Sequence, residues 1–390
     1  MLAWEHGRNF GRLSRLLAVA QMVERQGGEP VWVVPRSQRD APALRVLEHR
    51  KLQAPVLEQQ TFGPDFRADS FAEVLMASGF DDATRVLSAV EGWADAIEAV
   101  MPECIVLDYA PAAQLTSQLL NLPAFQLSNG FDAPPPDCPP YASVRPDSPL
   151  GRRTSGCVAA LSATISEVGV RFGGPRASSL AHILRYPRHV LECIPETDPY
   201  GPRQEALWVG PLTPLRDDDG QESPWRADGR RPRVFAQLGG RRGATDLLDA
   251  LQESGADTLC FWRGAPDKVL ARYSEGPVRV LGQFTLSAAM LAGADAVISQ
   301  GATALVSRAM LAGKPQMIFP ADFEKLKVAQ RAAASGAAMV WNPTECGARD
   351  ALQRLLHTPA LGEAARAVSA RYLPDWFEAN RNRFARNLIG

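Results

Sequence analysis

The chain has 390 residues, enough for one large core, but we expect two domains of roughly 150–200 residues each. Its 42 Lys and Arg residues nearly balance its 43 Asp and Glu residues, which disfavours nucleic acid or an anionic membrane as a partner and favours a small molecule. The 6 cysteines form no Cys-x-x-Cys pair, no apolar run approaches a membrane helix, and Trp4-Glu5-His6 breaks the apolar start too early for a signal peptide; we therefore expect a soluble cytoplasmic protein without a metal site.

The first residues form a strand, a loop, a helix and a second strand. Met1–Trp4 and Val31–Val34 are apolar strand patterns, and a helical pattern begins at Leu13 and closes at Gly27-Gly28. Open parallel sheets bind ligands at the carboxyl ends of their strands. The loop 5–12 is therefore a predicted ligand loop, and it contains His6, whose imidazole titrates in the range that acid–base catalysis needs.

Two further strands are predicted in this half. Ile105–Asp108 is a buried strand that ends in an acid, which we expect at the same sheet edge as the first loop. A helix at 112–120 leads to the strand Ala124–Leu127. The residues after it, Asn129, Phe131 and Asp132, open a proline-rich loop up to Pro149. Such a loop forms either a wall of a substrate pocket or a plain surface excursion.

A second strand–helix series follows a polar stretch. Residues 213–231 are charged and turn-rich, which is typical of a linker, and we interpret Asp217-Asp218-Asp219 within it as a solvated run rather than a metal site. The strand Val234–Leu238 then ends in the turn Gly239–Gly243. Its glycines let backbone approach a ligand, and Arg241 and Arg242 could neutralise a diphosphate.

The stretch from Val278 to Trp341 alternates strands with helices. Its central turn, Gln300-Gly301-Ala302-Thr303, ends the strand Ala296–Ser299 and opens a helix. Free N–H groups and the positive end of the helix dipole meet there, an arrangement that suits an anion such as phosphate. An ordinary strand-to-helix turn is the alternative. The chain finishes with helical patterns at 346–357 and 372–388.

Two motifs in this half resemble a known family. They are ADAVIxxGxT at 294–303 and LAGxPQxxxP at 311–320. Together with the two β/α halves, they resemble the GT-B fold of the bacterial relatives of UDP-glycosyltransferases. The resemblance implies an α/β protein with two Rossmann-like domains that face each other across a cleft. The implied domains are an acceptor domain at 1–212, a linker at 213–231, a nucleotide-sugar donor domain at 232–365, and a terminal helix at 366–390 that packs back on the acceptor domain.

The resemblance also implies a function and a set of site residues. The function is hexosyl transfer with inversion from a nucleotide sugar, UDP- or dTDP-linked, to a small-molecule acceptor, with the nucleotide sugar as co-substrate and no other cofactor. The residues implied for the donor are Gly239, Gly240, Arg242, Phe284, Thr285, Gln300, Gly301, Ala302, Thr303, Glu324 and Lys325. For the acceptor we predict Asn129, Phe131 and Asp132, in the loop after the strand Ala124–Leu127. For catalysis, the resemblance matches Asp108 to the acid that orients the family's histidine and puts Arg12 at the position of that histidine, and we add His6 because it lies in the same loop.

Three positions depart from the family pattern. A Gly-His pair after the first strand supplies the family's general base, but this chain has Gly11-Arg12, and arginine stays protonated at neutral pH. Gln300 replaces the histidine of the phosphate turn, so a hydrogen-bond donor is kept and a positive charge is lost. Lys325 replaces a neutral amide with a cation.

Three functions are compatible with these departures. The protein is an inverting glycosyltransferase whose base is His6 or Asp108, or whose acceptor needs no base. Alternatively, it binds a nucleotide or another anionic ligand without catalysis, or it catalyses another reaction on a nucleotide-linked substrate, such as epimerisation. We expect the first, because stabilisation of the leaving group by helix N-termini and cations is the part of the mechanism that the sequence keeps best.

Overall fold

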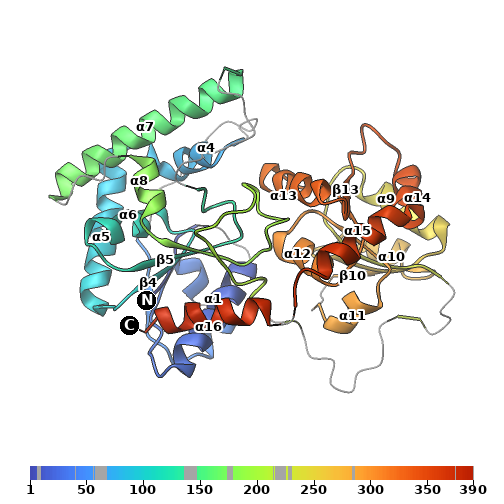
Figure 1. Ribbon diagram of the computed structural model, residues 1–390, viewed down its shortest axis with the longest axis horizontal. Coiled ribbons are helices and arrows are strands. Elements are labelled where there is room, and N and C mark those ends of the chain that lie inside the picture. The colour runs from blue at the N-terminus through green and yellow to red at the C-terminus, as the bar shows by residue number, and fades with distance from the viewer. Residues whose placement is uncertain are drawn as a thin grey trace. The chain divides into compact units, whose positions relative to one another are not determined.

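The computed structural model describes residues 1–6, 10–39, 41–55, 57, 68–135, 147–173, 179–213, 215, 225–226, 231–282, 286–373 and 375–389. The chain divides into two compact units (Figure 1). Unit 1 contains Met1–Glu192, Pro202–Thr213 and Phe377–Gly390, and unit 2 contains Cys193–Gly201 and Pro214–Trp376. The sequence did not indicate that the segment Cys193–Gly201 groups with the second half. Most of the predicted linker at 213–231 lies outside the described residues.

The described part of unit 1 is built on one parallel sheet with the strand order β3-β2-β1-β4-β5-β6-β7. Its strands are β1 (Leu2–Trp4), β2 (Trp32–Val34), β3 (Lys51–Gln53), β4 (Ile105–Asp108), β5 (Ala124–Ser128), β6 (Arg188–Leu191) and β7 (Leu207–Trp208). The central strands β1, β2, β4 and β5 are buried along their whole length. Both faces of this sheet are therefore covered, as in other parallel sheets.

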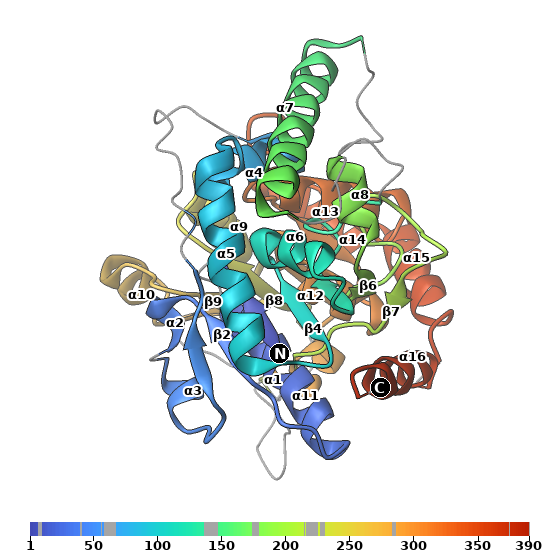
Figure 2. The same cartoon turned by 90° about the vertical axis from the view of Figure 1, so that its left-hand side faces the viewer.

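Helices cover the two faces of this sheet. They are α1 (Phe10–Arg25), α2 (Arg36–Arg39), α3 (Pro42–Arg45), α4 (Phe71–Leu75), the π-helix η1 (Met76–Phe80), α5 (Ala83–Val100), α6 (Pro111–Leu119), α7 (Pro149–Phe172), α8 (Leu180–Arg185) and α16 (Trp376–Asn387). On one face, Leu16 of α1 and Phe384 of α16 share a core with Trp4 and Val106, and Figure 1 shows α16 alongside α1. Helices α5, α6 and α7 lie on the other face (Figure 2).

Capping residues set the bounds of the long helices in unit 1. Asp82 accepts hydrogen bonds from the N–H groups of Thr84 and Arg85 and starts α5. Ser148 caps α7, which starts at Pro149, the residue where the predicted proline-rich loop ends. A Ser-Pro pair is a helix start signal, because proline is tolerated in the first turn.

Unit 2 is built on a second parallel sheet, which in the described residues has the order β10-β9-β8-β11-β12-β13. Its strands are β8 (Arg233–Leu238), β9 (Asp257–Trp262), β10 (Val278–Leu281), β11 (Ala296–Ser299), β12 (Gln316–Ile318) and β13 (Ala338–Val340). Its helices are α9 (Ala244–Ser254), α10 (Asp267–Arg272), α11 (Ala288–Gly293), α12 (Thr303–Leu311), α13 (Phe323–Ala334), α14 (Ala348–His357) and α15 (Pro359–Ser369).

The side chains of β8 alternate between two cores in unit 2. Val234 and Ala236 join a core with α9 and α14, whereas Phe235 joins one with Leu291 of α11 and Leu305 of α12. Successive residues of a strand point to opposite faces of a sheet, so each sheet in this protein is the middle of three layers. The predicted α/β class with two Rossmann-like units is confirmed. None of the described helices is long and apolar enough to cross a membrane.

Candidate functional site

The carboxyl edge of the unit 1 sheet brings together the residues predicted for catalysis. Strands β1 and β4 pair in register, with Trp4 opposite Asp108, so the loop after β1 begins beside the acid that ends β4. Helix α1 then presents Arg12 and Arg15, which lie three residues apart and hence on one helix face. Both arginines contact Asp108.

Two arginines and three acids form a buried charge cluster, which consists of Arg12, Arg15, Asp108, Asp132 and Glu192. The Arg12 guanidinium donates to Asp108 Oδ1 at 2.6 Å and to Asp132 Oδ2 at 3.3 Å. Arg15 donates to Asp108 Oδ2 through Nε and to Glu192 Oε1, each at 2.5 Å. Burial raises the pKa of Glu192, although Arg15 opposes this shift. Burial alone would lower the pKa of Arg15, but Asp108 and Glu192 raise it well above its usual value.

Arg12 stands where the family resemblance places a histidine, and it keeps the contact with an acid. Its guanidinium also lies over the ring of Tyr109, 4.8 Å from the ring centroid. Tyr109 has a positive φ of 48°, a conformation that costs about 1–3 kcal/mol in a residue other than glycine. The arginine is therefore held from two sides, by carboxylates and by an aromatic ring.

His6 is 6 % exposed, and its Nε2 atom is buried without a hydrogen-bond partner. Its backbone N–H donates to the Tyr109 carbonyl at 3.2 Å, and its carbonyl accepts a bond from Trp4 Nε1 at 2.6 Å. Burial, followed by the charge of Arg12, lowers the pKa of His6 to about 4. The imidazole is therefore neutral at pH 7 and a weak base.

Glu5 is buried beside His6, and its carboxylate oxygens accept bonds from the N–H groups of Ala112 at 3.1 Å and Ala113 at 2.6 Å, in the first turn of α6. Burial raises the pKa of Glu5 to about 8, and these backbone hydrogen bonds only partly oppose the shift. The Glu5 side chain therefore holds a proton at pH 7 that the unfolded chain has released.

We expect unit 1 to lose stability as the pH rises from about 4.5 to about 8, because the folded state keeps the Glu5 proton over this range and the unfolded state does not. Glu5→Gln removes this contribution. The free energy of unfolding of the variant, relative to that of the native protein, should therefore rise with pH, by a few kcal/mol up to pH 8. Urea unfolding at several pH values measures it, with pulsed hydrogen exchange to assign the transition to unit 1. As a control, Glu29→Gln changes an exposed residue, and the unfolding free energy of this variant should depend on pH as it does in the native protein. A difference in unfolding free energy between Glu5→Gln and the native protein that stays the same at every pH would contradict the expectation.

The loop after β5, predicted to bind the acceptor, is held by its own side chains. Ser128 Oγ contacts the Asp132 carboxylate and accepts a bond from the Gly130 N–H. Asn129 Oδ1 accepts the N–H of Phe131 at 3.2 Å, and the Phe131 ring is buried against Phe71. Among these predicted acceptor residues, Asp132 belongs to the charge cluster, while Asn129 is half-buried.

Two glycine-rich turns meet at the carboxyl edge of the unit 2 sheet. The Gln300 side chain reaches the turn after β8, with Nε2 at 3.5 Å from the Gly239 carbonyl oxygen, the outer limit of a hydrogen bond. A Cβ atom on Gly239 would lie 3.0 Å from Gln300 Oε1. Helix α12 starts at Thr303 after Ala302, and no side chain caps it. The predicted phosphate turn is thus a helix N-terminus that lies beside the Gly239–Gly243 turn.

Helix α13 also packs against this turn. Gly301 has a φ of +89°, and a Cβ atom there would lie 2.9 Å from Lys325 Cβ and 3.0 Å from the Lys325 carbonyl oxygen. The Lys325 ammonium forms an ion pair with Asp322, which caps α13. Arg241 donates to the Pro320 carbonyl and lies over the Phe319 ring. Two cations therefore flank the turn, where Gln300 itself is neutral.

The other predicted donor residues differ in their positions. Gly240 and Arg242 are exposed on the turn after β8, Glu324 is half-buried in the first turn of α13, and the Thr303 side chain is buried. Phe284 and Thr285, predicted to contact the nucleotide base, lie outside the described residues. So does the acidic run 217–219.

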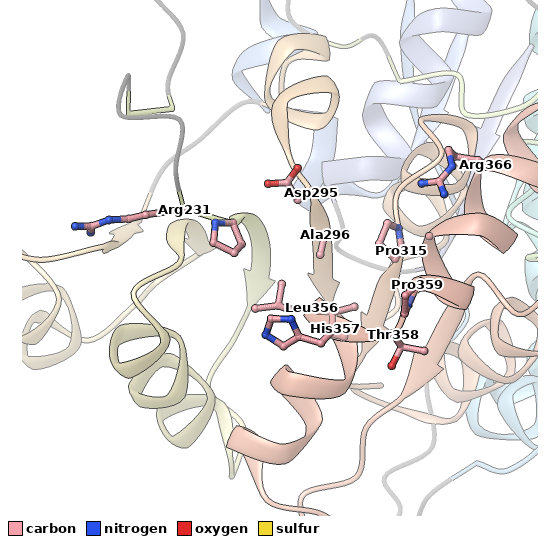
Figure 3. Close-up of a pocket in the computed structure, with 12 residues that line it drawn as sticks. Arg231, Asp295, Ala296, Pro315, Leu356, His357, Thr358, Pro359 and Arg366 are labelled. Carbon is pink, nitrogen blue, oxygen red and sulfur yellow. The ribbon is translucent and has the colours of Figure 1, made fainter.

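A pocket of about 730 Å³ lies at the opposite, amino edge of the unit 2 sheet. Figure 3 shows Asp295 and Ala296 at the start of β11, Pro315 before β12, and His357 at the end of α14 around it. Because this edge faces away from the glycine turns, the pocket is separate from the predicted donor site. Among the described residues, no cluster of three or more His, Cys, Asp or Glu side chains could hold a metal ion.

Sequence reasoning missed two members of the charge cluster, Arg15 and Glu192. A signal existed for both. Arg15 interrupts an apolar run of α1, and Glu192 follows the buried end of β6 just as Asp108 closes β4. A lone charge in a buried helix face and an acid directly after a buried strand each require a partner. The partner could not be named, because the two residues are 177 positions apart.

Solved structures resemble this chain along nearly all of its length. CalG4, the calicheamicin glycosyltransferase, superposes with a TM-score of 0.71 at 18 % identity and covers 98 % of this chain and 95 % of its own. VinC, a glycosyltransferase in complex with dTDP, superposes with a TM-score of 0.64 at 17 % identity and covers 100 % of this chain and 97 % of its own. SnogD, a glycosyltransferase from Streptomyces nogalater, superposes with a TM-score of 0.62 at 19 % identity and covers 96 % of this chain and 94 % of its own.

The chain has the GT-B fold. The predicted fold is thereby confirmed, including the two Rossmann-like units. No family model matches the sequence, and no curated protein sequence matches it either. Because the identities to the solved structures lie below 20 %, the likeness establishes the fold, and the activity has to be argued from the residues of the two sheet edges.

Proposed function

We propose that the protein is a glycosyltransferase of the hexosyl type, which moves a sugar with inversion from a UDP- or dTDP-linked donor to a small-molecule acceptor. The observation that carries the proposal is the pair of turns at the carboxyl edge of unit 2. There, the uncapped N-terminus of α12 lies beside the Gly239–Gly243 turn. Backbone N–H groups of this kind bind phosphate without any change in the fold.

The ligands of structural neighbours support a nucleotide donor and a small acceptor. VinC is solved with dTDP and the glycosyltransferase SsfS6 from Streptomyces sp. SF2575 with thymidine diphosphate. The rhamnosyltransferase SpnG is solved with the spinosyn aglycone. From the family resemblance of the sequence, we assign the donor to unit 2 and the acceptor to unit 1.

The proposed donor site takes its residues from four segments of unit 2. The diphosphate contacts the turn 300–303 and the glycines Gly239 and Gly240, with Arg242 close by. Glu324 and Lys325 bind the sugar, and Phe284 and Thr285 bind the nucleotide base. Arg241 and Lys325 supply the positive charge that Gln300 does not, and they stabilise the diphosphate as it leaves. Such preorganised electrostatic stabilisation often contributes more to catalysis than any other single effect.

The acceptor side of the mechanism has three candidate forms. His6 could take the acceptor's proton, Asp108 could take it, or the acceptor needs no base. His6 is buried with a pKa of about 4, and Asp108 is fully buried between two arginines. A general base must reach the proton that it abstracts and must bind it near the working pH. These observations favour the third form, with Arg12 and Asp108 as parts of the acceptor site.

Calorimetric titration of uridine, thymidine and guanosine diphosphates and their sugars tests the proposal. We expect at least one diphosphate to bind with a Kd below roughly 1 mM, which corresponds to about −4 kcal/mol, and its sugar to be slowly hydrolysed. Inosine and free ribose serve as controls that lack the diphosphate and should not bind. If every nucleotide fails to bind at millimolar concentration, the proposal is wrong.

A second function is favoured by one observation: an arginine, paired with Asp108, occupies the base position. Under this alternative the protein binds the nucleotide without catalysis. Tight binding combined with neither donor hydrolysis nor transfer to any acceptor would support it over the transferase.

A further inference from the structure

The pocket at the amino edge of the unit 2 sheet has a wall that is partly apolar. Proline, alanine and leucine side chains contribute to this wall from the sheet edge and from helices α14 and α15. They belong to Pro232, Ala296, Pro315, Leu355, Leu356 and Pro359. The volume of about 730 Å³ lies within the range of about 300–1,000 Å³ that is usual for sites of small organic molecules. The pocket therefore has room for a ligand with an apolar body of one or two rings.

The charged residues around this pocket favour an anion. Among the described residues that line it, two are arginines, one is a histidine and one is an acid: Arg231, Arg366, His357 and Asp295. The Asp295 carboxylate already accepts a hydrogen bond at 2.8 Å from the backbone N–H of Arg233. Figure 3 shows that Arg231 points away from the other labelled residues. A ligand in the pocket therefore meets Arg366 and His357.

The Arg366 guanidinium lies near the N-terminus of its own helix, α15. A Cβ atom on Gly362 would be 3.3 Å from Arg366 Nη1, so the side chain runs back along the helix over this glycine. A cation is unfavourable there, because the helix dipole places positive charge at the same end. The first turn of α15 contains no acid, and Arg366 forms no ion pair with Glu363 or with any other residue in the described part of the chain. An anion in the pocket would compensate the guanidinium and the helix dipole together.

Two further hydrogen-bond donors lie beside Arg366. Thr358 is the N-cap residue of α15, but its hydroxyl does not cap the helix. His357 ends α14, and its imidazole carries an N–H group in either protonation state. Neither side chain makes a hydrogen bond to a residue that the structure describes. Guanidinium, hydroxyl and imidazole N–H groups are donors that phosphate and carboxylate oxygens accept readily.

We propose that this pocket binds an amphipathic organic anion. The phosphate or carboxylate head contacts Arg366, Thr358 and His357, and the apolar body packs against the prolines and leucines of the wall. The pocket is at the amino end of β11, whereas the proposed donor turn follows the carboxyl end of this strand. The site is therefore additional to the donor site, and the inference goes beyond the proposed glycosyl transfer.

Calorimetric titration with 1-naphthyl phosphate and 1-naphthoate tests the proposal. The controls are 1-naphthol, which has no charge, 1-naphthylmethylamine, which is a cation, and inorganic phosphate, which has no apolar body. We expect at least one of the two naphthyl anions to bind with a Kd below roughly 1 mM, and each control to bind at least about tenfold more weakly. Failure of both anions to bind, or a control that binds as tightly as the better anion, would overturn the proposal.

Substitutions test whether the anion lies in this pocket. Arg366→Gln should weaken its binding at least about tenfold, because a charged hydrogen-bond donor is lost. Gly362→Leu should weaken it similarly by filling the pocket, and the helix accepts this change because a Cβ atom there meets only the Arg366 side chain. The matched control is Arg349→Gln, at an exposed arginine of α14 that pairs with Glu253 away from the pocket. It should keep the native affinity. Thermal unfolding verifies that each variant is folded, and unchanged affinity in Arg366→Gln would overturn the proposal.

The donor site gives a second control. Gly301→Ala alters the turn before α12, at the other edge of the sheet, and should leave the affinity for 1-naphthyl phosphate unchanged. Arg366→Gln, conversely, should leave nucleotide affinity unchanged. If Gly301→Ala weakens binding of 1-naphthyl phosphate as much as Arg366→Gln does, the anion occupies the donor turn and the inference is wrong, while the transferase stands. If no nucleotide binds, the proposed function fails, and binding of the naphthyl anion that depends on Arg366 still supports the inference.

Discussion

Replacing Arg15 with methionine should destabilise unit 1 by roughly 3–5 kcal/mol, the typical cost of removing one partner from a buried ion pair. Arg15 bonds Asp108 through two nitrogens and Glu192 through a third. Methionine has a similar length and fills much of the same space, but it leaves two buried acids without this partner. Urea unfolding, with pulsed hydrogen exchange to identify the unit, measures the loss.

The Arg15 result can be separated from a simple packing defect. If stability is lost because Asp108 and Glu192 no longer have a partner, Glu192→Gln added to Arg15→Met should recover part of the lost stability. A neutral amide costs less to bury than a charge. Arg171→Met serves as the matched control in the same unit. That arginine is exposed and pairs with Glu167 one helix turn away, so its loss should change stability by at most roughly 0.5 kcal/mol. A loss below roughly 1 kcal/mol for Arg15→Met would contradict the buried-pair argument.

Replacing Gly301 with alanine should reduce nucleotide affinity at least tenfold. The residue has a φ of +89°, which costs about 1–3 kcal/mol in any other amino acid. The added Cβ would also press on Lys325 at 2.9 Å from its Cβ and 3.0 Å from its carbonyl oxygen. The second contact is with backbone, so α13 or the turn has to move. Calorimetry with the diphosphate found to bind best gives the change.

A glycine of similar conformation provides the control for Gly301. Gly255 has a φ of +70° at the end of α9, and a Cβ atom there would meet nothing within 4 Å. Gly255→Ala therefore introduces backbone strain in unit 2 without a steric clash at the turn. It should lower the stability of unit 2 and leave nucleotide affinity unchanged. Equal affinities of Gly301→Ala and Gly255→Ala for the diphosphate would mean that the α12 turn does not bind it.

Local patterns in the sequence predict much of this fold. The strands β1, β4, β8 and β11 are short apolar runs that end in a turn, an acid or a glycine, and they match the predicted strands to within one residue. The helix N-terminus at Thr303 is likewise evident from the small residues before it. Within unit 1, the sequence also brings Asp108 to the first loop, because parallel strands end at a common edge.

Long-range pairings explain what the sequence does not reveal. Strand β6 was not predicted, since Arg188 and His189 lower its apolar content, and its end supplies Glu192. The use of Cys193–Gly201 by unit 2 depends on contacts such as the hydrogen bond of Thr197 to Ser307, 110 residues away. The periodicity of apolar residues along the sequence cannot predict a contact between residues so far apart. The burial of His6 follows in the same way from its contact with Tyr109, on a strand end about a hundred residues later.

The position of α16 has a consequence for the order of events during synthesis. Phe384 and Leu388 complete the core face that Leu2, Trp4 and α1 begin, and Asn380 and Arg381 bond the carbonyls of Trp208 and Val209. Because translation proceeds from the amino end, the ribosome makes the whole of unit 2 before it makes α16. The core of unit 1 therefore cannot be completed until α16 has been synthesised.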